Sequence, residues 1–200
     1  VKVFIPLMSL LKIVSVIGFS TIITVFSGFV KGKVMAVYFG SGCLGIWSQS
    51  TNLFMTGSII SLFGLNQGLI KQIAGRDKDK RSGSFIYDTL SKSVFFSLCN
   101  SLIISLIIIF RAKGVSAFLF NNHLSPTMII LITIFLAFQV VGDVLGVFLL
   151  ANKEIKRFSL ANILISIFGL LSFIALCFFF GLRGAYFSVG VYGVITFASF

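Results

Sequence analysis

The fold of this chain is decided by the stretch AVYFGSGCLGIWSQ (Ala36–Gln49) and by GLNQGLIKQIAGRDKDKR (Gly64–Arg81) further along. The first stretch joins two long apolar runs through a glycine-rich turn that carries an aromatic residue. The second leaves the next apolar run through a dense group of basic residues. Two apolar runs, a tight turn between them and a basic loop after them are typical of a membrane protein, in which basic loops remain on the cytoplasmic side.

The composition agrees with this interpretation and excludes an ordinary soluble domain. Of the 200 residues, 58% are hydrophobic, 25 are Phe and only 10% are charged, whereas a soluble domain carries about 25% charged residues. A bilayer accepts so much apolar surface because lipid is the solvent of the outer face. The net charge of +11 comes from basic residues in short loops between apolar runs, which favours cytoplasmic anchoring over nucleic-acid binding.

Six apolar runs are long enough, or nearly so, to cross the membrane, since a helix needs about 20 residues to span about 30 Å of hydrocarbon. Helices are expected because each backbone N–H and C=O in lipid must be paired within its own segment. We therefore predict an all-α integral membrane protein, a six-helix transmembrane bundle forming one unit over residues 1–200. The predicted spans are residues 7–30 (continuing toward Tyr38), 44–70, 85–110, 127–150, 158–180 and 185–200. Because the last run is cut short at Phe200, we expect the chain to be part of a longer protein.

The orientation follows from counting Lys and Arg in alternate loops. Eleven basic residues fall on one side of the predicted bundle and five on the other, so the richer side and the N-terminus are predicted to be cytoplasmic. The first group is Lys2, Lys12, Lys71, Arg76, Lys78, Lys80, Arg81, Lys92, Lys153, Lys156 and Arg157, and the second is Lys31, Lys33, Arg111, Lys113 and Arg183.

Each predicted span carries small or polar residues at steps of three or four, which places them on one helix face. Tight packing of membrane helices through small residues is one interpretation, favoured for the third and fifth spans. Stripes on all six spans also fit a bundle around a polar, water-accessible cavity. The candidate cavity or substrate residues are Thr24, Ser27, Lys31, Gln49, Asn52, Asn66 and Asn162.

Asp143 is the most informative single residue, because it lies ten residues before Lys153 and hence about 15 Å into the membrane. A carboxylate at the centre of a span costs about 2.5–3.5 kcal/mol, and Asp is too short to reach the head groups. It should face a cavity, pair with a cation or carry a proton, which makes it a candidate for ion coupling or gating. A purely structural pair is the alternative. For Lys31, near the outer face, snorkelling is an alternative to a substrate contact.

The chain contains few of the residues that metal sites and enzyme active sites use. Cys43, Cys99 and Cys177 form no CxxC or Cys/His cluster, and His123 is the only histidine, so neither a metal site nor a cofactor is expected. A membrane enzyme acting on diphosphate sugars would need paired carboxylates, or an outer loop with Arg and His. The longest outer loop, Arg111–Pro126, holds no acid, and the chain is not expected to be an enzyme.

Four motifs follow one another around the predicted spans: AVYFGSGCLGIWSQSTNLF (Ala36–Phe54), GLNQGLIKQIA (Gly64–Ala74), LLANKEIKRFSLANIL (Leu149–Leu164) and GLRGAYFSVGVYGV (Gly181–Val194). In this order and spacing, over essentially all 200 residues, the chain resembles the N-terminal half of a polysaccharide, or O-antigen, flippase of the Wzx type. That family belongs to the multidrug/oligosaccharidyl-lipid/polysaccharide exporter superfamily.

The resemblance implies one lobe of a flippase with twelve to fourteen helices, which works by alternating access. Such a protein moves an undecaprenyl-diphosphate-linked oligosaccharide, such as an O-antigen repeat unit of lipopolysaccharide, from the cytoplasmic to the periplasmic leaflet of the bacterial inner membrane. The implied partners are this substrate, membrane lipids, H⁺ or Na⁺ as a coupling ion, and other proteins of polysaccharide assembly. Nucleic acid and cofactors are not among them.

A cation-coupled multidrug exporter of the same superfamily is the alternative within transport. It would bind organic cations and would need acidic residues in its cavity, whereas Asp143 is the only acid deep in an apolar run. Lys31 and Lys92 lie in or beside the spans, so a lipid-linked sugar is the favoured substrate. A membrane scaffold would explain the spans but not the polar stripes.

The count of basic residues predicts that the segment Arg76–Arg81 lies in the cytoplasm. In a chain whose native cysteines are replaced by alanine, Lys78→Cys should react with a membrane-impermeant maleimide only after the cells are permeabilised. Lys113→Cys, in the predicted outer loop, should react in intact cells and is the control. Labelling of position 78 from outside would overturn the predicted topology.

Overall fold

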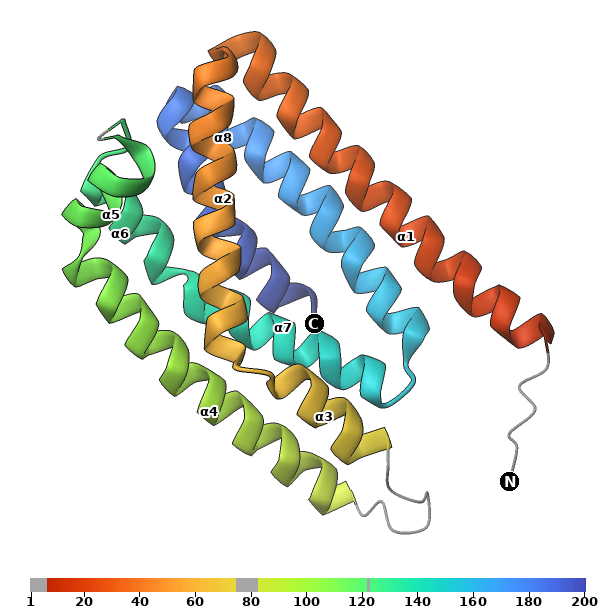
Figure 1. Cartoon of the computed structure of the whole chain (residues 1–200). Helices are drawn as coiled ribbons and strands as arrows, with labels where there is room; N and C mark the ends of the chain where they lie inside the picture. The colour runs from red at the N-terminus through yellow and green to blue at the C-terminus, as the bar shows by residue number, and fades with distance from the viewer. Residues whose placement is uncertain (1–6, 75–82, 122) are drawn as a thin grey trace.

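A computed structural model describes residues 7–74, 83–121 and 123–200, and over these residues the chain is helical apart from short connections (Figure 1). The prediction of an all-α protein is confirmed for this part of the chain. The elements in order are α1 (Leu7–Val34), a short π-helix η1 (Met35–Phe39), α2 (Ser41–Leu62), α3 (Leu65–Ala74), α4 (Gly83–Phe110), α5 (Ala112–Phe120), α6 (Pro126–Ile134), α7 (Leu136–Ala151) and α8 (Ile155–Ser199). The basic segment Arg76–Arg81 and Lys2, which contribute to the predicted orientation, lie outside the described residues.

Four helices of the described part are long and apolar enough to cross a membrane, and a fifth is added if a bent pair counts as one span. The four are Val14–Phe39, Phe85–Phe110, Pro126–Ala151 and Ile155–Ser199, and the bent pair is Ser41–Leu62 with Leu65–Ile73. Large apolar side chains such as Phe29, Phe110 and Phe178 are exposed on the outside of these helices, where lipid can cover them. The arrangement is compatible with a multi-pass membrane protein.

Several predicted runs are interrupted in ways that the apolar pattern does not reveal. The second run bends by 48° between α2 and α3, where Phe63 and Gly64 both have positive φ angles. The fourth run divides at Phe135 into α6 and α7, and the connection 111–126, predicted as an outer loop, consists largely of α5. Apolar residues continue on both sides of each break, so hydropathy alone cannot locate it.

The fifth and sixth predicted spans form one element, α8, which is broken at Gly181. This residue has φ 57° and ψ −138°, a conformation that favours glycine because a Cβ would collide with the backbone. In Figure 1 the chain runs along residues 155–180, turns there and returns along residues 182–199. A single glycine therefore takes the place of a loop between the two arms of α8.

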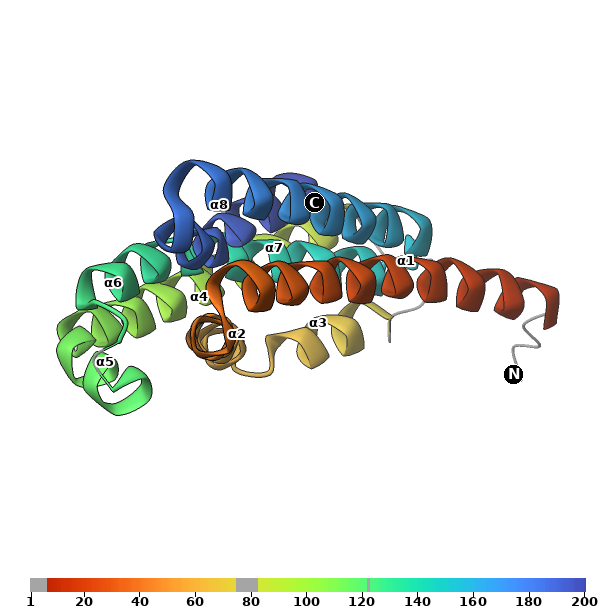
Figure 2. The ribbon, with the colours of Figure 1, turned by 90° about the horizontal axis from the view of Figure 1, so that it is seen from above.

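α7 is the central helix of the described part. It packs against α2, α3, α4, α6 and α8, and Figure 2 shows it between α8 and the α2–α3 pair. Its residues Leu136, Val140 and Val144, spaced by four, are at most 1% exposed. Because this spacing places all three on one helix face, that face forms the centre of the core.

Glycines allow α7 and the returning arm of α8 to approach closely. A Cβ added to Gly142 would lie 2.8 Å from the Thr196 methyl group and 3.0 Å from the backbone nitrogen of Phe197, and one added to Gly146 would lie 2.9 Å from the Phe200 ring. Lipid is as apolar as leucine, so membrane helices associate through such close packing rather than through the hydrophobic effect.

We predict that Gly142→Ala destabilises the protein by about 1–3 kcal/mol, because the methyl group must displace the backbone of α8. The melting temperature of the purified protein in detergent should fall accordingly. Gly18→Ala on α1 is the matched control, since nothing lies within 4 Å of its added Cβ. That change should be neutral or stabilise the helix by roughly 0.5–1 kcal/mol. Equal effects of the two changes would contradict the close α7–α8 contact.

Candidate functional site

A cavity of about 180 Å³, called here the lysine cavity, lies between α1, α2 and the two arms of α8. Its walls combine hydroxyl groups with aromatic and apolar side chains, and Lys31 supplies the only charge among the residues that line it. The lining residues are Thr24, Ser27, Gly28, Lys31, Trp47, Thr51, Phe54, Met55, Ser166, Gly169, Ser188, Val189 and Tyr192. The polar stripes of the first, fifth and sixth predicted spans thus meet at one place.

Lys31 has an aromatic neighbour rather than an acidic one. Its Nζ lies 5.3 Å from the centroid of the Tyr192 ring, a cation–π contact that attracts the ammonium weakly when exposed and more strongly when desolvated. Among the described residues the only ion pairs are Lys92–Asp88 and Arg157–Glu154, so no carboxylate in this part of the chain neutralises Lys31. The ammonium can therefore receive an anion.

Trp47 adds a second hydrogen-bond donor to the same cavity. Its ring packs against Phe173, with 5.7 Å between the centroids, and its Nε1 is buried without an acceptor among the described residues. A buried donor without a partner costs about 1–3 kcal/mol. The lysine cavity thus offers two donor groups, the Lys31 ammonium and the Trp47 indole, that no described acceptor satisfies.

Hydroxyl groups attach α1 to α8 beside Lys31. The Oγ atoms of Thr24 and Ser166 are 2.8 Å apart, and the Ser27 hydroxyl donates to the Ser166 carbonyl at 3.0 Å. The Thr24 and Ser166 hydroxyls also lie 3.0 Å and 2.8 Å from carbonyls of their own helices, those of Ser20 and Asn162. The two hydroxyls have only two protons for these three contacts. When one hydroxyl donates to the other across the helices, it gives up its bond to the carbonyl of its own helix.

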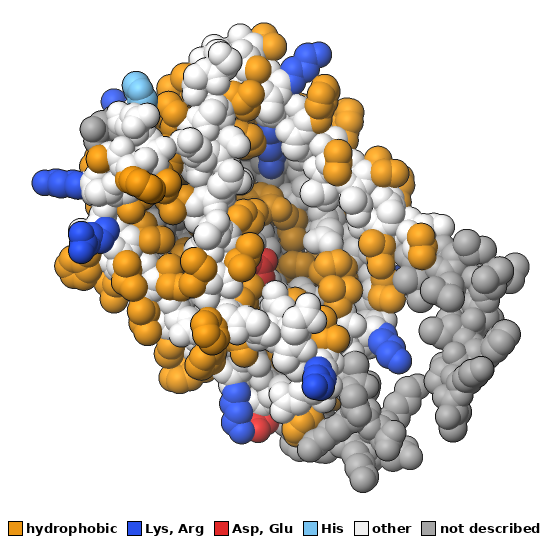
Figure 3. All heavy atoms as spheres, in the orientation of Figure 1, with side chains coloured by type: hydrophobic (Ala, Val, Ile, Leu, Met, Phe, Trp, Pro, Cys, Tyr) orange, Lys and Arg blue, Asp and Glu red, His pale blue; other side chains and the backbone are white. Residues whose placement is uncertain are grey.

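A second cavity of about 400 Å³, called here the carboxylate cavity, lies between α2, α3, α7 and both arms of α8. Asp143 supplies the charge on its lining, and in Figure 3 an acidic side chain is visible in the hollow of this face. The lining residues are Met55, Ile59, Leu62, Asn66, Gln139, Asp143, Gly146, Val147, Leu150, Phe158, Asn162, Ile165, Tyr192, Thr196 and Phe200.

Two neutral donors hold the Asp143 carboxylate. The Ser58 hydroxyl donates to Oδ2 at 2.6 Å, and the Gln139 amide nitrogen, one turn earlier on α7, donates to Oδ1 at 2.9 Å. These bonds orient the carboxylate but leave its charge uncompensated by any described cation.

Tyr192 joins the two cavities, because it contributes to the wall of each. It also lines a third hollow of about 210 Å³ that includes Ser20, Thr21 and Asn162. A cationic cavity and an anionic cavity therefore lie next to one another, with one aromatic residue on their common boundary.

Six of the eight predicted site residues line one of these two cavities. Three of them, Lys31, Thr24 and Ser27, line the lysine cavity. The other three, Asn66, Asn162 and Asp143, line the carboxylate cavity. The remaining two, Gln49 and Asn52, are exposed and are not among the residues that line either cavity.

Several residues of the site were not among the predicted candidates, and Trp47, Tyr192 and Ser58 are examples. Trp47 lines the lysine cavity, whereas Tyr38, an aromatic residue at the end of the first predicted span, is 78% exposed. Tyr192 could have been found, because it belongs to the polar stripe of the sixth predicted span. Ser58 carried no such signal: polar residues surround α2, and Ser58 lies on the face opposite to the predicted one.

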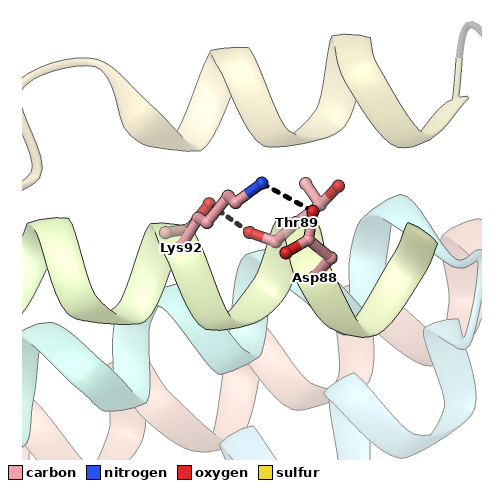
Figure 4. A network of polar contacts seen from close by, with 4 residues as sticks. Asp88, Thr89 and Lys92 are labelled. Atoms are coloured by element: carbon pink, nitrogen blue, oxygen red, sulfur yellow. Dashed lines mark hydrogen bonds and ion pairs between the residues drawn. The ribbon is translucent and has the colours of Figure 1, made fainter. Parts of the chain in front are cut away.

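The serine stripe of the third predicted span serves packing. Ser97 and Ser101 are fully buried on α4, and their hydroxyls donate to carbonyls of their own helix, those of Val94 and Leu98. Lys92 on the same helix donates to Asp88 at 2.7 Å, as Figure 4 shows. This pair is exposed and lies away from the two cavities, so Lys92 adds no charge to them.

Comparison of the chain with protein-family models, with curated proteins and with solved structures finds no match. The described residues contain no group of three or more His, Cys, Asp or Glu side chains that could hold a metal ion. What the site can do follows from its geometry: it can bind an anion beside Lys31, a cation beside Asp143, and polar groups at the hydroxyls between them.

The contact between Thr24 and Ser166 predicts a measurable coupling between α1 and α8. A double-mutant cycle of Thr24→Ala and Ser166→Ala, followed by thermal unfolding in detergent, should give a coupling of about 0.6 kcal/mol, typical of hydrogen bonds between membrane helices. Thr21→Ala combined with Ser166→Ala is the control and should be additive, because the Thr21 hydroxyl donates to Ile17 of its own helix. Additivity of the first pair would contradict the hydrogen bond between these two hydroxyls.

Proposed function

We propose that this chain forms one six-helix lobe of a flippase for undecaprenyl-diphosphate-linked oligosaccharides, such as O-antigen repeat units. The flippase works by alternating access in the bacterial inner membrane, with the N-terminus in the cytoplasm. The count of six takes α2 and α3 as one bent span and the two arms of α8 as separate spans. With an even number of spans, a second lobe of the same kind would share the orientation of the first.

The observation that carries this proposal is the unpaired Lys31 ammonium in a cavity lined by hydroxyl groups. A lysine binds phosphate groups as a point charge, and the Trp47 indole next to it offers a further donor. The hydroxyls of Ser27 and Thr51 donate to backbone carbonyls, and their oxygens can still accept hydrogen bonds from the hydroxyl groups of a sugar. A polyprenyl tail needs no such groups, since it remains in the lipid that covers the apolar outer surface.

The multidrug exporter remains the second candidate, and Asp143 is the observation that favours it. The carboxylate cavity combines this acid with the aromatic side chains of Phe158, Tyr192 and Phe200, and an organic cation could bind to such a set through charge and ring contacts. The two candidates use different cavities, so they predict different consequences of removing Lys31.

We predict that Lys31→Ala lowers export of the lipid-linked sugar roughly ten- to a hundredfold, because a hydrogen bond to a charged group contributes about 1.5–3 kcal/mol. The measurement is complementation of a surface-polysaccharide export defect by the full-length gene, with surface polysaccharide and membrane levels of the protein quantified together.

Lys33→Ala is the matched control. Lys33 is two residues further along α1 and exposed, and its loss removes the same charge without reaching the cavity. Normal export with Lys31→Ala would reject the substrate site. If the full-length protein instead lowers drug accumulation, and Asp143→Asn abolishes that effect while Lys31→Ala does not, the exporter is the correct function.

A further inference from the structure

Two of the residues that line the carboxylate cavity have a side-chain oxygen without a hydrogen-bond donor among the described residues. Gln139 is only 4% exposed, and it lines this cavity together with Asp143. Its amide nitrogen donates to the carboxylate, and its Oε1 is buried with no partner among the described residues. Reversing the amide would not relieve this, because the oxygen would then face the negatively charged carboxylate. The orphan acceptor is thus a consequence of Asp143.

Asn66 contributes another unpaired oxygen from a different helix. It belongs to the first turn of α3 and lines the same cavity, and its Oδ1 is buried without a donor among the described residues. Two amide oxygens without donors therefore accompany a carboxylate whose charge no described cation compensates. Each orphan acceptor is costly in a protein interior, and all three groups are oxygen atoms of the kind that bind a positive ion.

The kind of ion follows from the ligand atoms. Carboxylate and amide oxygens are ligands for hard cations, whereas transition metals favour the nitrogen and sulfur of His and Cys, and neither of these lines this cavity. The single carboxylate gives the site one negative charge, which matches a monovalent ion. The donors already present, from Ser58 and Gln139, leave further lone pairs on both Asp143 oxygens.

We propose that Asp143, Gln139 and Asn66 form a binding site for a monovalent alkali cation such as Na⁺. The ion joins α3 to α7 immediately after the bend at Phe63 and Gly64, so its binding stabilises the bent arrangement of α2 and α3 (Figure 1). Ion sites beside interrupted helices are a recurrent feature of membrane transporters. This inference deepens the proposed function and rests on it for the role of the ion in transport, whereas binding is tested separately.

The test is thermal unfolding of the purified full-length protein in detergent, with NaCl titrated against choline chloride at constant ionic strength and pH. Sodium should raise the melting temperature saturably. At about a hundred times the dissociation constant, the folded-to-unfolded ratio should rise about a hundredfold over that in choline. Asp143→Asn should abolish the sodium effect, and Asn66→Ala should weaken the sodium affinity roughly ten- to a hundredfold.

Asp88→Asn is the matched control. It makes the same chemical change at an exposed carboxylate that pairs with Lys92 on α4, and it should leave the sodium effect unchanged. Binding of radioactive sodium to the same variants provides a second measurement, so that Asn66→Ala decides the question if Asp143→Asn does not fold. A melting temperature that responds to pH alone, and equally in sodium and choline, would overturn the proposal in favour of a proton site.

Two further outcomes would also overturn it: a full sodium effect in Asp143→Asn, or an equal loss in Asp88→Asn. Because no sugar substrate is present, the result does not depend on the proposed function. A protein that binds sodium at Asp143 but exports no lipid-linked sugar would keep the ion site and reject the flippase. A protein that exports the sugar but shows no sodium effect would keep the flippase and reject the ion site.

Discussion

The burial of a carboxylate inside a bundle of apolar helices is the constraint on which this structure depends. Near the middle of a bilayer such a charge costs several kcal/mol, and neutral hydrogen bonds recover only part of that cost. Asp143 on α7 requires the hydroxyl of Ser58, and α2 must therefore lie close to α7. Gly57, next to Ser58, makes this possible, because a Cβ at this position would lie 3.2 Å from a Leu136 methyl group. The buried Asp143 carboxylate thus accounts both for the polar interior and for the close contact of α2 with the central helix α7.

The two cavities are chemically opposite and share Tyr192. Beside Lys31 the unsatisfied groups are donors, and beside Asp143 they are acceptors. An anion and a cation would therefore find separate surfaces within one bundle. The interruptions of the helices lie next to these surfaces: Asn66 follows the bend between α2 and α3, and Gly181 joins the arms of α8 that form walls of both cavities. A change at Gly181 would therefore alter walls of both cavities, whereas a change in the α2–α3 bend would alter the carboxylate cavity.

Much of the fold was predictable, and part of the site was predictable with it. The lengths of the apolar runs indicated an all-helical chain, which is what the described residues form, and the depth of Asp143 marked it as a residue needing a cavity or a partner. The stripe Thr24–Ser27–Lys31 does face the interior. The break at Phe135 was not predictable, because apolar residues continue through it without a change in pattern. At Phe63 the following residues Gly64, Asn66 and Gln67 interrupt the apolar run, but they do not by themselves give the size of the bend.

The sequence by itself determined the class of this protein, since the helical form of a long apolar segment in lipid depends only on that segment and on the pairing of its own backbone groups. Tertiary structure alone decided which side of α2 forms the site. On α2 the polar residues lie all around the helix, and packing against α7 and α8 selects Thr51 and Ser58 for the interior while Gln49 and Asn52 remain exposed. Where polar residues lie all around a helix, its rotation about its axis is set by contacts with segments distant in the chain, and the local pattern does not contain that information.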